Sequence, residues 1–302
     1  MTTVIPSSQL SDLTRSELEV WAAAGAPDQC ALRRLYVETC NEYNASSLAT
    51  DDGYYHKPND FTLLQLKEVV QRLPATEGLF LDIGTGSGIV PRVIRRLGTR
   101  AVTVDWPVTG TEKAILSARE AGVEGHYCQV GKEPLPLPND SVDCLLFADV
   151  IEHLLHSPKP VLAEILRVLK PGGACVATTP NALRLTVRVK VPLGYSNWPL
   201  VLDYWDAEFH GGHHHEYTID EFREVFRRAG FMEENFLLHE ARLGSVRVSG
   251  FDQIRTLSRR TTPTSQRMSL VLRIASGILG AVARVLPHLR SEMVIVARKP
   301  EH

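Results

Sequence analysis

The sequence predicts an α/β protein with a doubly wound, mostly parallel sheet of seven strands. From Gly78 onward, short apolar runs alternate with amphipathic stretches of helical periodicity. That alternation is typical of a parallel sheet covered by helices on both faces. The first apolar run ends in a glycine-rich turn, residues 84–88, which leads directly into a helical pattern. Residues 1–75 are predicted as a helical N-terminal extension, and residues 76–302 as the α/β domain.

The elements of this domain are expected in the following order. Apolar runs predict strands at residues 78–83, 100–105, 126–130, 142–148, 174–179, 235–240 and 292–298. Helical periodicity that ends near glycine predicts helices at residues 88–98, 112–121, 160–169 and 218–230. Thr218 and Glu221 have the spacing of a capping box at the last of these helices. Two insertions, 181–217 and 242–290, follow strands, where substrate-binding segments usually lie.

Composition excludes some classes of partner. The 302 residues are 44% hydrophobic and 23% charged, with a formal net charge of −2. This balance argues against DNA, and RNA is disfavoured because Arg184, Arg188 and Lys190 form only a modest basic patch. The five cysteines form no C-x-x-C pair, and the N-terminus has no signal-peptide pattern. Reduced thiols and a cytoplasmic location are therefore expected.

The segment 270–286 is more apolar than the rest of the chain. Arg273 and Arg284 interrupt it, and it falls short of the roughly 20 apolar residues that a spanning helix needs. We favour a buried or half-buried helix here. The alternative is a peripheral contact with a membrane, because an apolar helix flanked by arginines can lie in the interface.

The glycine-rich turn has the spacing D-x-G-x-G-x-G over residues 82–88. Glycines let a backbone approach a ligand closely, and the helix that follows offers N–H groups. A dinucleotide turn would be G-x-G-x-x-G, but Ile89 stands where its third glycine belongs, which disfavours a nicotinamide oxidoreductase. The pattern resembles motif I of class I S-adenosylmethionine-dependent methyltransferases. The resemblance implies S-adenosyl-L-methionine as cofactor, an antiparallel last strand, and Asp82 near the amino acid end of the cofactor.

Asp105 ends the second predicted strand, about twenty residues beyond the loop, as a carboxylate that binds ribose hydroxyls should. Trp106 beside it is a candidate to pack on the adenine. After the third strand the family usually has an acid near the adenine amino group, whereas this chain has Gln129, whose amide oxygen can accept the same hydrogen bond. The cofactor-binding residues implied are Asp82, Gly84, Thr85, Gly86, Gly88, Asp105, Trp106, Gln129, Val130 and Asp149.

The fourth strand is followed by Asp149 and then by the segment Val150-Ile151-Glu152-His153-Leu154. The segment resembles that of a subgroup containing ubiquinone-pathway O-methyltransferases, small-RNA 2′-O-methyltransferases and glycan-tailoring enzymes. If a helix begins here, Asp149 faces the same side as Glu152 and His153, at i+3 and i+4. Members of the subgroup also use a distant histidine, which by its position before Tyr217 would be His213.

These residues admit three roles. His153 is a candidate general base, because its pKa lies naturally near working pH. Alternatively, Asp149, Glu152, His153 and His213 hold a divalent metal such as Mg²⁺ or Zn²⁺, which would bind acceptor oxygens. In the third interpretation, Glu152 and His153 cap a helix and the histidine run 213–215 is a solvated loop.

The predicted function is S-adenosylmethionine-dependent methyl transfer to a hydroxyl on a small molecule or on a glycan or lipid-linked intermediate. Aromatic residues in the first insertion suit either a lid over a ring-bearing acceptor or the insertion's own core: Tyr195, Trp198, Tyr204, Trp205 and Phe209. One alternative is a cofactor-binding regulatory protein without catalysis, since fold does not determine function. Another is methylation of nitrogen, of carbon or of an RNA 2′-hydroxyl.

Overall fold

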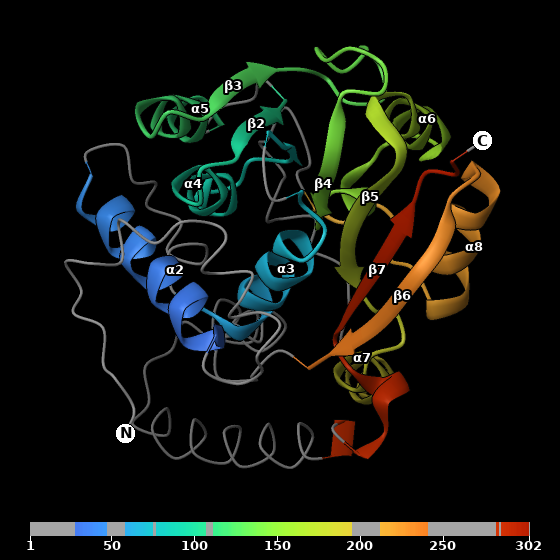
Figure 1. The fold of residues 1–302 in the computed structure, drawn as a ribbon. Helices are drawn as coiled ribbons and strands as arrows, with labels where there is room; N and C mark the ends of the chain where they lie inside the picture. The colour runs from blue at the N-terminus through green and yellow to red at the C-terminus, as the bar shows by residue number, and fades with distance from the viewer. Residues whose placement is uncertain are drawn as a thin grey trace.

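The computed structural model of the chain describes residues 28–46, 58–74, 77–106, 111–194, 212–240, 282–283 and 285–301. Within them, seven strands form one sheet in the order β3-β2-β1-β4-β5-β7-β6 (Figure 1). Their bounds are β1 Leu79–Ile83, β2 Arg100–Asp105, β3 Glu124–Tyr127, β4 Val142–Ala148, β5 Leu169–Pro180, β6 Met232–His239 and β7 Glu292–Arg298. β7 runs antiparallel to β5 and β6, whereas the remaining pairs are parallel. The predicted fold class, including the antiparallel last strand, is confirmed.

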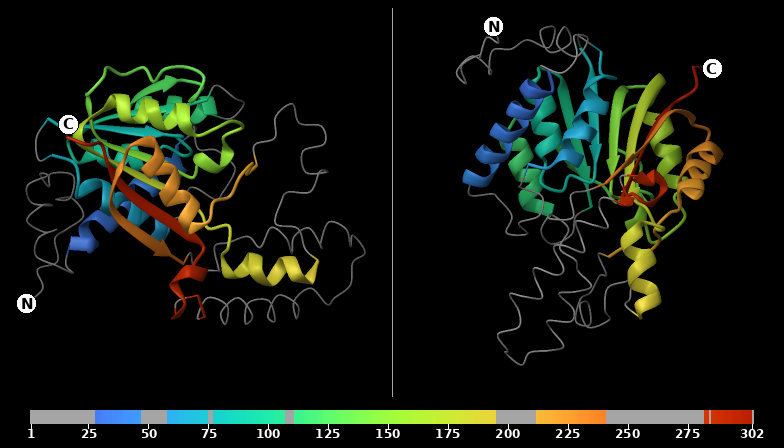
Figure 2. Two further views of the ribbon diagram at one scale, coloured as in Figure 1. Left: turned by 90° about the vertical axis from the view of Figure 1, so that its right-hand side faces the viewer. Right: turned by 90° about the horizontal axis from the view of Figure 1, so that it is seen from below.

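Helices cover both faces of the sheet (Figure 2). Their bounds are α2 Asp28–Ala45, α3 Asp60–Val70, α4 Ile89–Arg96, α5 Thr111–Glu120, α6 Lys159–Val168, α7 Leu185–Lys190 and α8 Ile219–Ala229. Short 3-10 turns are η2 Ile151–His153, η3 Val191–Leu193 and η5 Pro287–Leu289. Alternate strand residues point to opposite faces. Phe80 therefore packs in the core beneath α2, α3 and α4, whereas Leu81 packs in the core beneath α6 and α8.

β5 is longer than predicted. It begins at Leu169, directly after α6, and so includes the segment 170–173 that was expected to separate helix and strand. Leu169 already pairs with Val142, and the register shifts before the ladder resumes at Ala174. Gly172 adopts a φ of +73°, which favours glycine. Its N–H donates to the carbonyl of Lys299, and the N–H of Lys299 donates to Gly173, each at 3.0 Å. The C-terminal extension of β7 therefore holds the glycine pair in the sheet.

β3 begins two residues earlier and ends three residues earlier than predicted. Its register with β2 pairs Asp105 with Tyr127, so β3 ends where β2 ends. The capping box is confirmed: the Thr218 hydroxyl accepts from Glu221 N, and the Glu221 carboxylate accepts from Thr218 N. Between these caps and Gly230, which has a φ of +100°, the whole of α8 lies within its predicted limits.

Candidate methyltransferase site

The glycine-rich turn connects β1 to α4 at the carboxyl edge of the sheet. Gly84, Gly86 and Gly88 have φ angles of +85°, +50° and +68°, which L side chains rarely adopt. A Cβ on Gly84 would lie 2.4 Å from Cγ2 of Val150, so the turn packs directly on the segment after β4. A Cβ on Gly86 would meet nothing within 4 Å. The backbone at Gly86 is therefore accessible to a ligand.

A buried chain of hydroxyls connects this turn to Asp82. The hydroxyl oxygens of Thr85 and Thr103 lie 2.7 Å apart, and Thr103 donates to Oδ2 of Asp82 at 3.3 Å. Burial raises the pKa of Asp82 well above its ordinary value, the nearby charge of Asp105 raises the pKa further, and the hydrogen bond from Thr103 lowers it. A positively charged group of a ligand placed beside Asp82 would stabilise the ionised form of this carboxyl.

Asp105 ends β2 beside the turn, because β1 and β2 are parallel and Ile83 pairs with Val104. Its Oδ1 accepts from the backbone N–H of Trp106 at 2.7 Å. Burial raises the pKa of Asp105, and backbone N–H groups of Trp106, Thr85 and Gly86 lower it. The carboxylate is therefore held beside the turn, where the sequence predicts the residue that binds the ribose hydroxyls.

Gln129 and Val130 follow β3 at the same edge, since β3 is the neighbour of β2. The N–H of Cys128 donates to the carbonyl of Asp105 at 2.8 Å. The N–H of Gln129 donates to Oε2 of Glu133 at 2.7 Å. The fold therefore brings the residues predicted for the ribose and the adenine to adjacent strand ends; their contacts with a cofactor stay a prediction.

Because the pKa of Asp82 is raised in the folded protein, the free energy of unfolding should depend on pH. We expect Asp82→Asn to stabilise the cofactor-free protein increasingly as the pH rises above about 4. The folded chain keeps the Asp82 proton to higher pH than the unfolded chain does. Its stability therefore falls as the pH rises through the raised pKa, and asparagine removes that loss. Urea unfolding at about pH 5 and about pH 8 measures the effect, and an advantage of Asp82→Asn that is equal at both values would contradict it.

The segment after β4 differs from its predicted conformation. The helix that would place Asp149, Glu152 and His153 on one face does not form, because the segment contains only the single 3-10 turn η2, which begins at Ile151. Asp149 precedes it with a φ of +52°. Its N–H donates to the carbonyl of Thr178 at 3.0 Å, which extends the β4–β5 pairing past the end of β4. That bond holds Asp149 to the sheet and delays the helix.

The side chain of Asp149 is held from β5 as well. Its Oδ1 accepts from the Thr178 hydroxyl at 2.9 Å, and Gln65 of α3 donates to the same hydroxyl oxygen at 3.2 Å. Burial raises the pKa of Asp149, while the Thr178 bond and the nearby His213 lower it. Gln65 and Thr178 were not identified from the sequence. They lie on α3 and β5, far from Asp149 in the chain, and only the fold brings them to its side chain.

Glu152 is fully buried, with an exposed fraction of 0%. Its Oε2 accepts from the Thr179 hydroxyl at 2.9 Å, whereas its Oε1 has no hydrogen-bond partner among the described residues. Burial raises the pKa of Glu152 well above its ordinary value, and the charges of Asp149 and Glu216 add to that rise. A buried carboxylate oxygen without a partner is costly and calls for a ligand.

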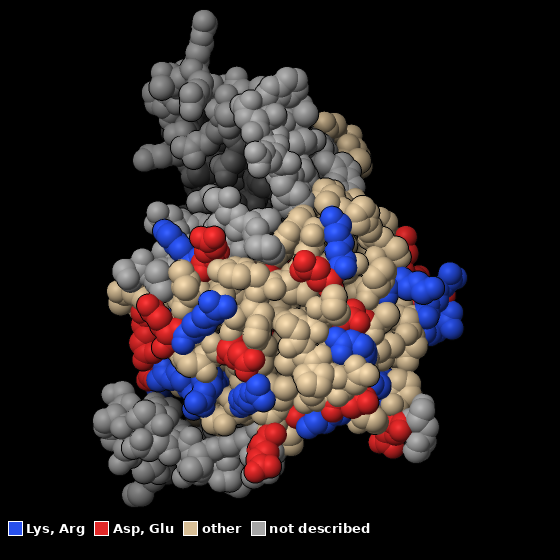
Figure 3. Space-filling view, turned by 90° about the horizontal axis from the view of Figure 1, so that it is seen from above, with Lys and Arg blue, Asp and Glu red and all other residues tan. Residues whose placement is uncertain are grey.

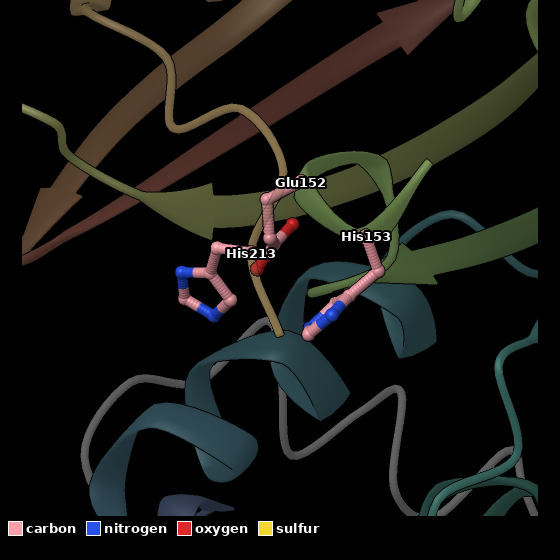
Figure 4. A group of neighbouring side chains, drawn as sticks. All are labelled: Glu152, His153 and His213. Carbon is pink, nitrogen blue, oxygen red and sulfur yellow. The ribbon is translucent and has the colours of Figure 1, made fainter. Parts of the chain in front are cut away.

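His153 and His213 complete a group with Glu152 (Figure 4). One ligand atom from each of the three lies within 4.8 Å of the others. The two imidazole rings meet edge to face, with centroids 4.9 Å apart. Nδ1 of His153 lies 3.2 Å from the carbonyl of Gly212. Asp149, predicted as a fourth ligand, lies outside this group of donors.

Backbone hydrogen bonds attach the histidine loop to η2. The N–H groups of His214 and His215 donate to the carbonyl of Glu152 at 2.7 and 3.2 Å. Glu216 accepts from Nδ1 of His213 at 2.8 Å and forms an ion pair with Arg184. Burial acts to raise the pKa of Glu216, but the bonds from His213 and Arg184 outweigh it and lower the pKa to about 2.

Glu292 is a further carboxylate that sequence reasoning missed. It begins β7 opposite Pro180 and His239, and therefore lies at the same sheet edge as the ends of β5 and β6. Burial raises the pKa of Glu292 well above its ordinary value, and the nearby charge of Asp149 raises it further. The available signal was an acid at the start of the apolar run 292–298.

The remaining predictions concern the surface and the insertions. Basic and acidic side chains are interspersed on the described part of the face in Figure 3. Arg184, one of the three residues of the basic patch, is paired with Glu216. Among the described residues, no helix has the length and apolarity needed to cross a bilayer. The aromatic residues at 195–209 and most of the segment 270–286 lie outside the described residues.

Comparison with known proteins identifies the family of this chain. Residues 60–232 match a family model described as a methyltransferase domain, which is more than half of the chain. The chain belongs to the class I S-adenosylmethionine-dependent methyltransferases. This methyltransferase family uses S-adenosyl-L-methionine as its cofactor, and the resemblance inferred from the loop is confirmed.

Two curated relatives match part of this methyltransferase. The chain is 29% identical over 131 residues to a ubiquinone biosynthesis O-methyltransferase from Nitrosococcus oceani, covering 43% of the chain and 55% of the relative. It is 35% identical over 106 residues to a ubiquinone biosynthesis O-methyltransferase from Chelativorans sp., covering 35% of the chain and 42% of that relative. The chain thus spans about half the length of these relatives. A methyltransferase structure from Archaeoglobus fulgidus, at 16% identity and a TM-score of 0.50, covers 80% of this chain and 94% of its own, and shows the fold alone.

Proposed function

We propose that the protein transfers the methyl group of S-adenosyl-L-methionine to a hydroxyl oxygen of a small molecule or of a glycan or lipid-linked intermediate. One observation carries this proposal: the buried Oε1 of Glu152, which has no hydrogen-bond partner in the described part of the chain, lies beside His153 and His213. Glu152 and His153 directly follow Val150, which packs on Gly84, and His213 joins them from the loop before α8. The candidate acceptor site therefore adjoins the candidate cofactor site.

The donor set fits a divalent cation. A cation would satisfy Oε1 of Glu152, and two imidazoles with one carboxylate leave coordination positions open, as catalytic centres require. Oxygen and nitrogen donors suit Zn²⁺, Mn²⁺ or Mg²⁺. A cation held here by Glu152, His153 and His213 would bind the acceptor oxygen and lower the pKa of its hydroxyl. This interpretation assigns His153 as a ligand and not as a general base.

The other residues would orient the two reactants. Asp105 would bind the ribose hydroxyls, and the accessible backbone at Gly86 allows the cofactor to approach the turn. The hydroxyl of Thr178 orients Asp149. Asp149 lies next to Val150, which packs on the glycine-rich turn and is followed by Glu152. Methyl transfer needs an in-line arrangement of acceptor and methyl group more than covalent help, so positioning is the main contribution of these side chains. The names of the curated relatives support oxygen as the acceptor atom.

A binding and transfer experiment tests this function. We expect calorimetry to show binding of S-adenosyl-L-methionine and none of NAD. With methyl-labelled cofactor and a panel of catechols, phenols, sugars and amines, label should enter hydroxyl compounds. Prior treatment with chelator should suppress transfer, and Mn²⁺, Mg²⁺ or Zn²⁺ should restore it.

Four results would contradict parts of the proposal. Preference for NAD would overturn the cofactor, and label found only in amines would overturn the acceptor atom. Full transfer in chelator, together with an inactive His153→Ala protein, would replace the metal centre with His153 as a general base. A protein that binds the cofactor but labels no compound, including those in a broad metabolite extract, would support a regulatory role.

A further inference from the structure

The histidine run before α8 contains one residue with an acid three positions later. His213 is followed by Glu216 at this spacing, whereas His214 and His215 are followed by Tyr217 and Thr218. In the structure, Nδ1 of His213 lies 2.8 Å from Oε1 of Glu216. A carboxylate is an acceptor only, so the proton of this bond belongs to Nδ1. The lone pair of the His213 ring is then on Nε2.

Glu216 is itself held in place by Arg184. Nη1 of Arg184 lies 2.6 Å from Oε2 of Glu216, and Nη2 lies 3.1 Å from Oε1. This two-pronged geometry determines the carboxylate plane, which a single contact would leave free to rotate. The side chains of Arg184 and Glu216 are only 18% and 6% exposed, so solvent screens the pair weakly.

Both partners are anchored to the end of β5. Nη1 of Arg184 also donates to the carbonyl of Asn181 at 2.9 Å. Asn181 forms a β-bridge with Tyr217, and the N–H of Ala182 donates to the carbonyl of Tyr217 at 2.8 Å. The segment that carries Glu216 is therefore joined to the segment that carries Arg184 by backbone bonds as well as by the ion pair.

We propose that Glu216, held by Arg184, is the positioning residue that directs Nε2 of His213 toward the cation shared with Glu152 and His153. The inference rests on the metal centre of the proposed function and adds its supporting carboxylate and arginine. A carboxylate on the far nitrogen of a metal-binding imidazole keeps the proton off the ligand atom and makes that atom more basic. The same contact selects His213 from its neighbouring histidines.

Metal titration of Glu216→Gln tests the proposal. The chelator-treated wild-type protein and the variant are titrated with Mn²⁺ and Zn²⁺ in a calorimeter, without acceptor. We expect the variant to bind roughly 10–100-fold more weakly, the usual effect of removing such a supporting group. Arg184→Lys should lose less, because lysine keeps the charge but not the two-pronged contact.

Glu224→Gln is the matched control, since Glu224 forms its ion pairs with Arg227 and Arg228 on α8. It should bind metal like the wild type. Affinity for S-adenosyl-L-methionine should be unchanged in all variants, which verifies that they fold. Wild-type affinity for metal in Glu216→Gln would overturn this proposal alone. A wild-type protein that binds no metal would overturn the metal centre, and the proposal with it.

A second measurement needs no metal. Long-range nitrogen–proton NMR spectra of histidine-labelled protein report which ring nitrogen carries the proton. We expect His213 to be protonated on Nδ1 in the wild type and to populate the Nε2-protonated form in Glu216→Gln. The resonance is assigned with His213→Gln. An Nε2-protonated His213 in the wild-type protein would overturn the proposal.

Discussion

Glu152→Gln is expected to lose metal binding by more than about 100-fold and to become more stable in chelator. Removing a supporting group already costs roughly 10–100-fold, and this change removes a ligand itself. The amide keeps the size of the carboxyl group but cannot be an anionic ligand. The loss should appear in calorimetric titration with Mn²⁺ or Zn²⁺, and labelled methyl transfer should fall with it.

The gain in stability has a separate cause. Oε1 of Glu152 is buried and has no hydrogen-bond partner among the residues that the structure describes, and the charges of Asp149 and Glu216 lie nearby. An uncharged amide avoids the burial of a charge and its repulsion from these neighbours, so the free energy of unfolding in chelator should rise. Urea unfolding in chelator measures this gain, with Glu224→Gln as the control. A variant that binds metal like the wild type would contradict the assignment of Glu152 as a ligand, and a variant that is less stable in chelator would contradict the cost assigned to its buried carboxylate.

Asp105→Ala is expected to weaken binding of S-adenosyl-L-methionine by roughly 100-fold or more. A carboxylate that accepts from two ribose hydroxyls makes two charge-assisted bonds, each contributing about 1.5–3 kcal/mol. A loss of about 1.4 kcal/mol corresponds to a tenfold change in affinity, so losing both bonds gives an effect of this size. Calorimetry with the intact cofactor measures it.

The matched control is Asp220→Ala, because Asp220 lies on the exposed first turn of α8. It should bind the cofactor with wild-type affinity. Since Asp105 also accepts backbone N–H bonds from the turn, a thermal melt must show that Asp105→Ala remains folded. A folded Asp105→Ala protein that binds the cofactor within about threefold of wild type would show that ribose recognition lies elsewhere.

Much of the geometry of the candidate cofactor site could be predicted because its signals are local. The spacing of Gly84, Gly86 and Gly88 predicts a strand-to-helix turn from backbone conformations that glycine favours. Asp105 follows from the alternation of strands and helices, which brings parallel strand ends to one edge. The capping box at Thr218 and Glu221 likewise depends on residues three positions apart.

The conformation after β4 could not be predicted from local periodicity. A three- and four-residue spacing favours one helical face for Asp149, Glu152 and His153. The backbone bond from Asp149 to Thr178 and the hydroxyl of Thr178 keep Asp149 against β5 instead. The deciding partner is 29 residues away in sequence, so no short window of the chain contains it.

Local sequence patterns alone predict the fold class, the glycine-rich turn and the segment that carries Glu152 and His153. Each of these depends on backbone preference or apolar periodicity within a few residues. Only the folded chain shows His213 beside this pair, as its position before Tyr217 led us to expect, and shows Glu216 and Arg184 in contact behind it. Arg184 and Glu216 are 32 residues apart, and His153 and Gly212 are 59 apart. Such pairs meet only through the alignment of the ends of β4 and β5 with the loop before α8, which is a property of the packed sheet and its connections.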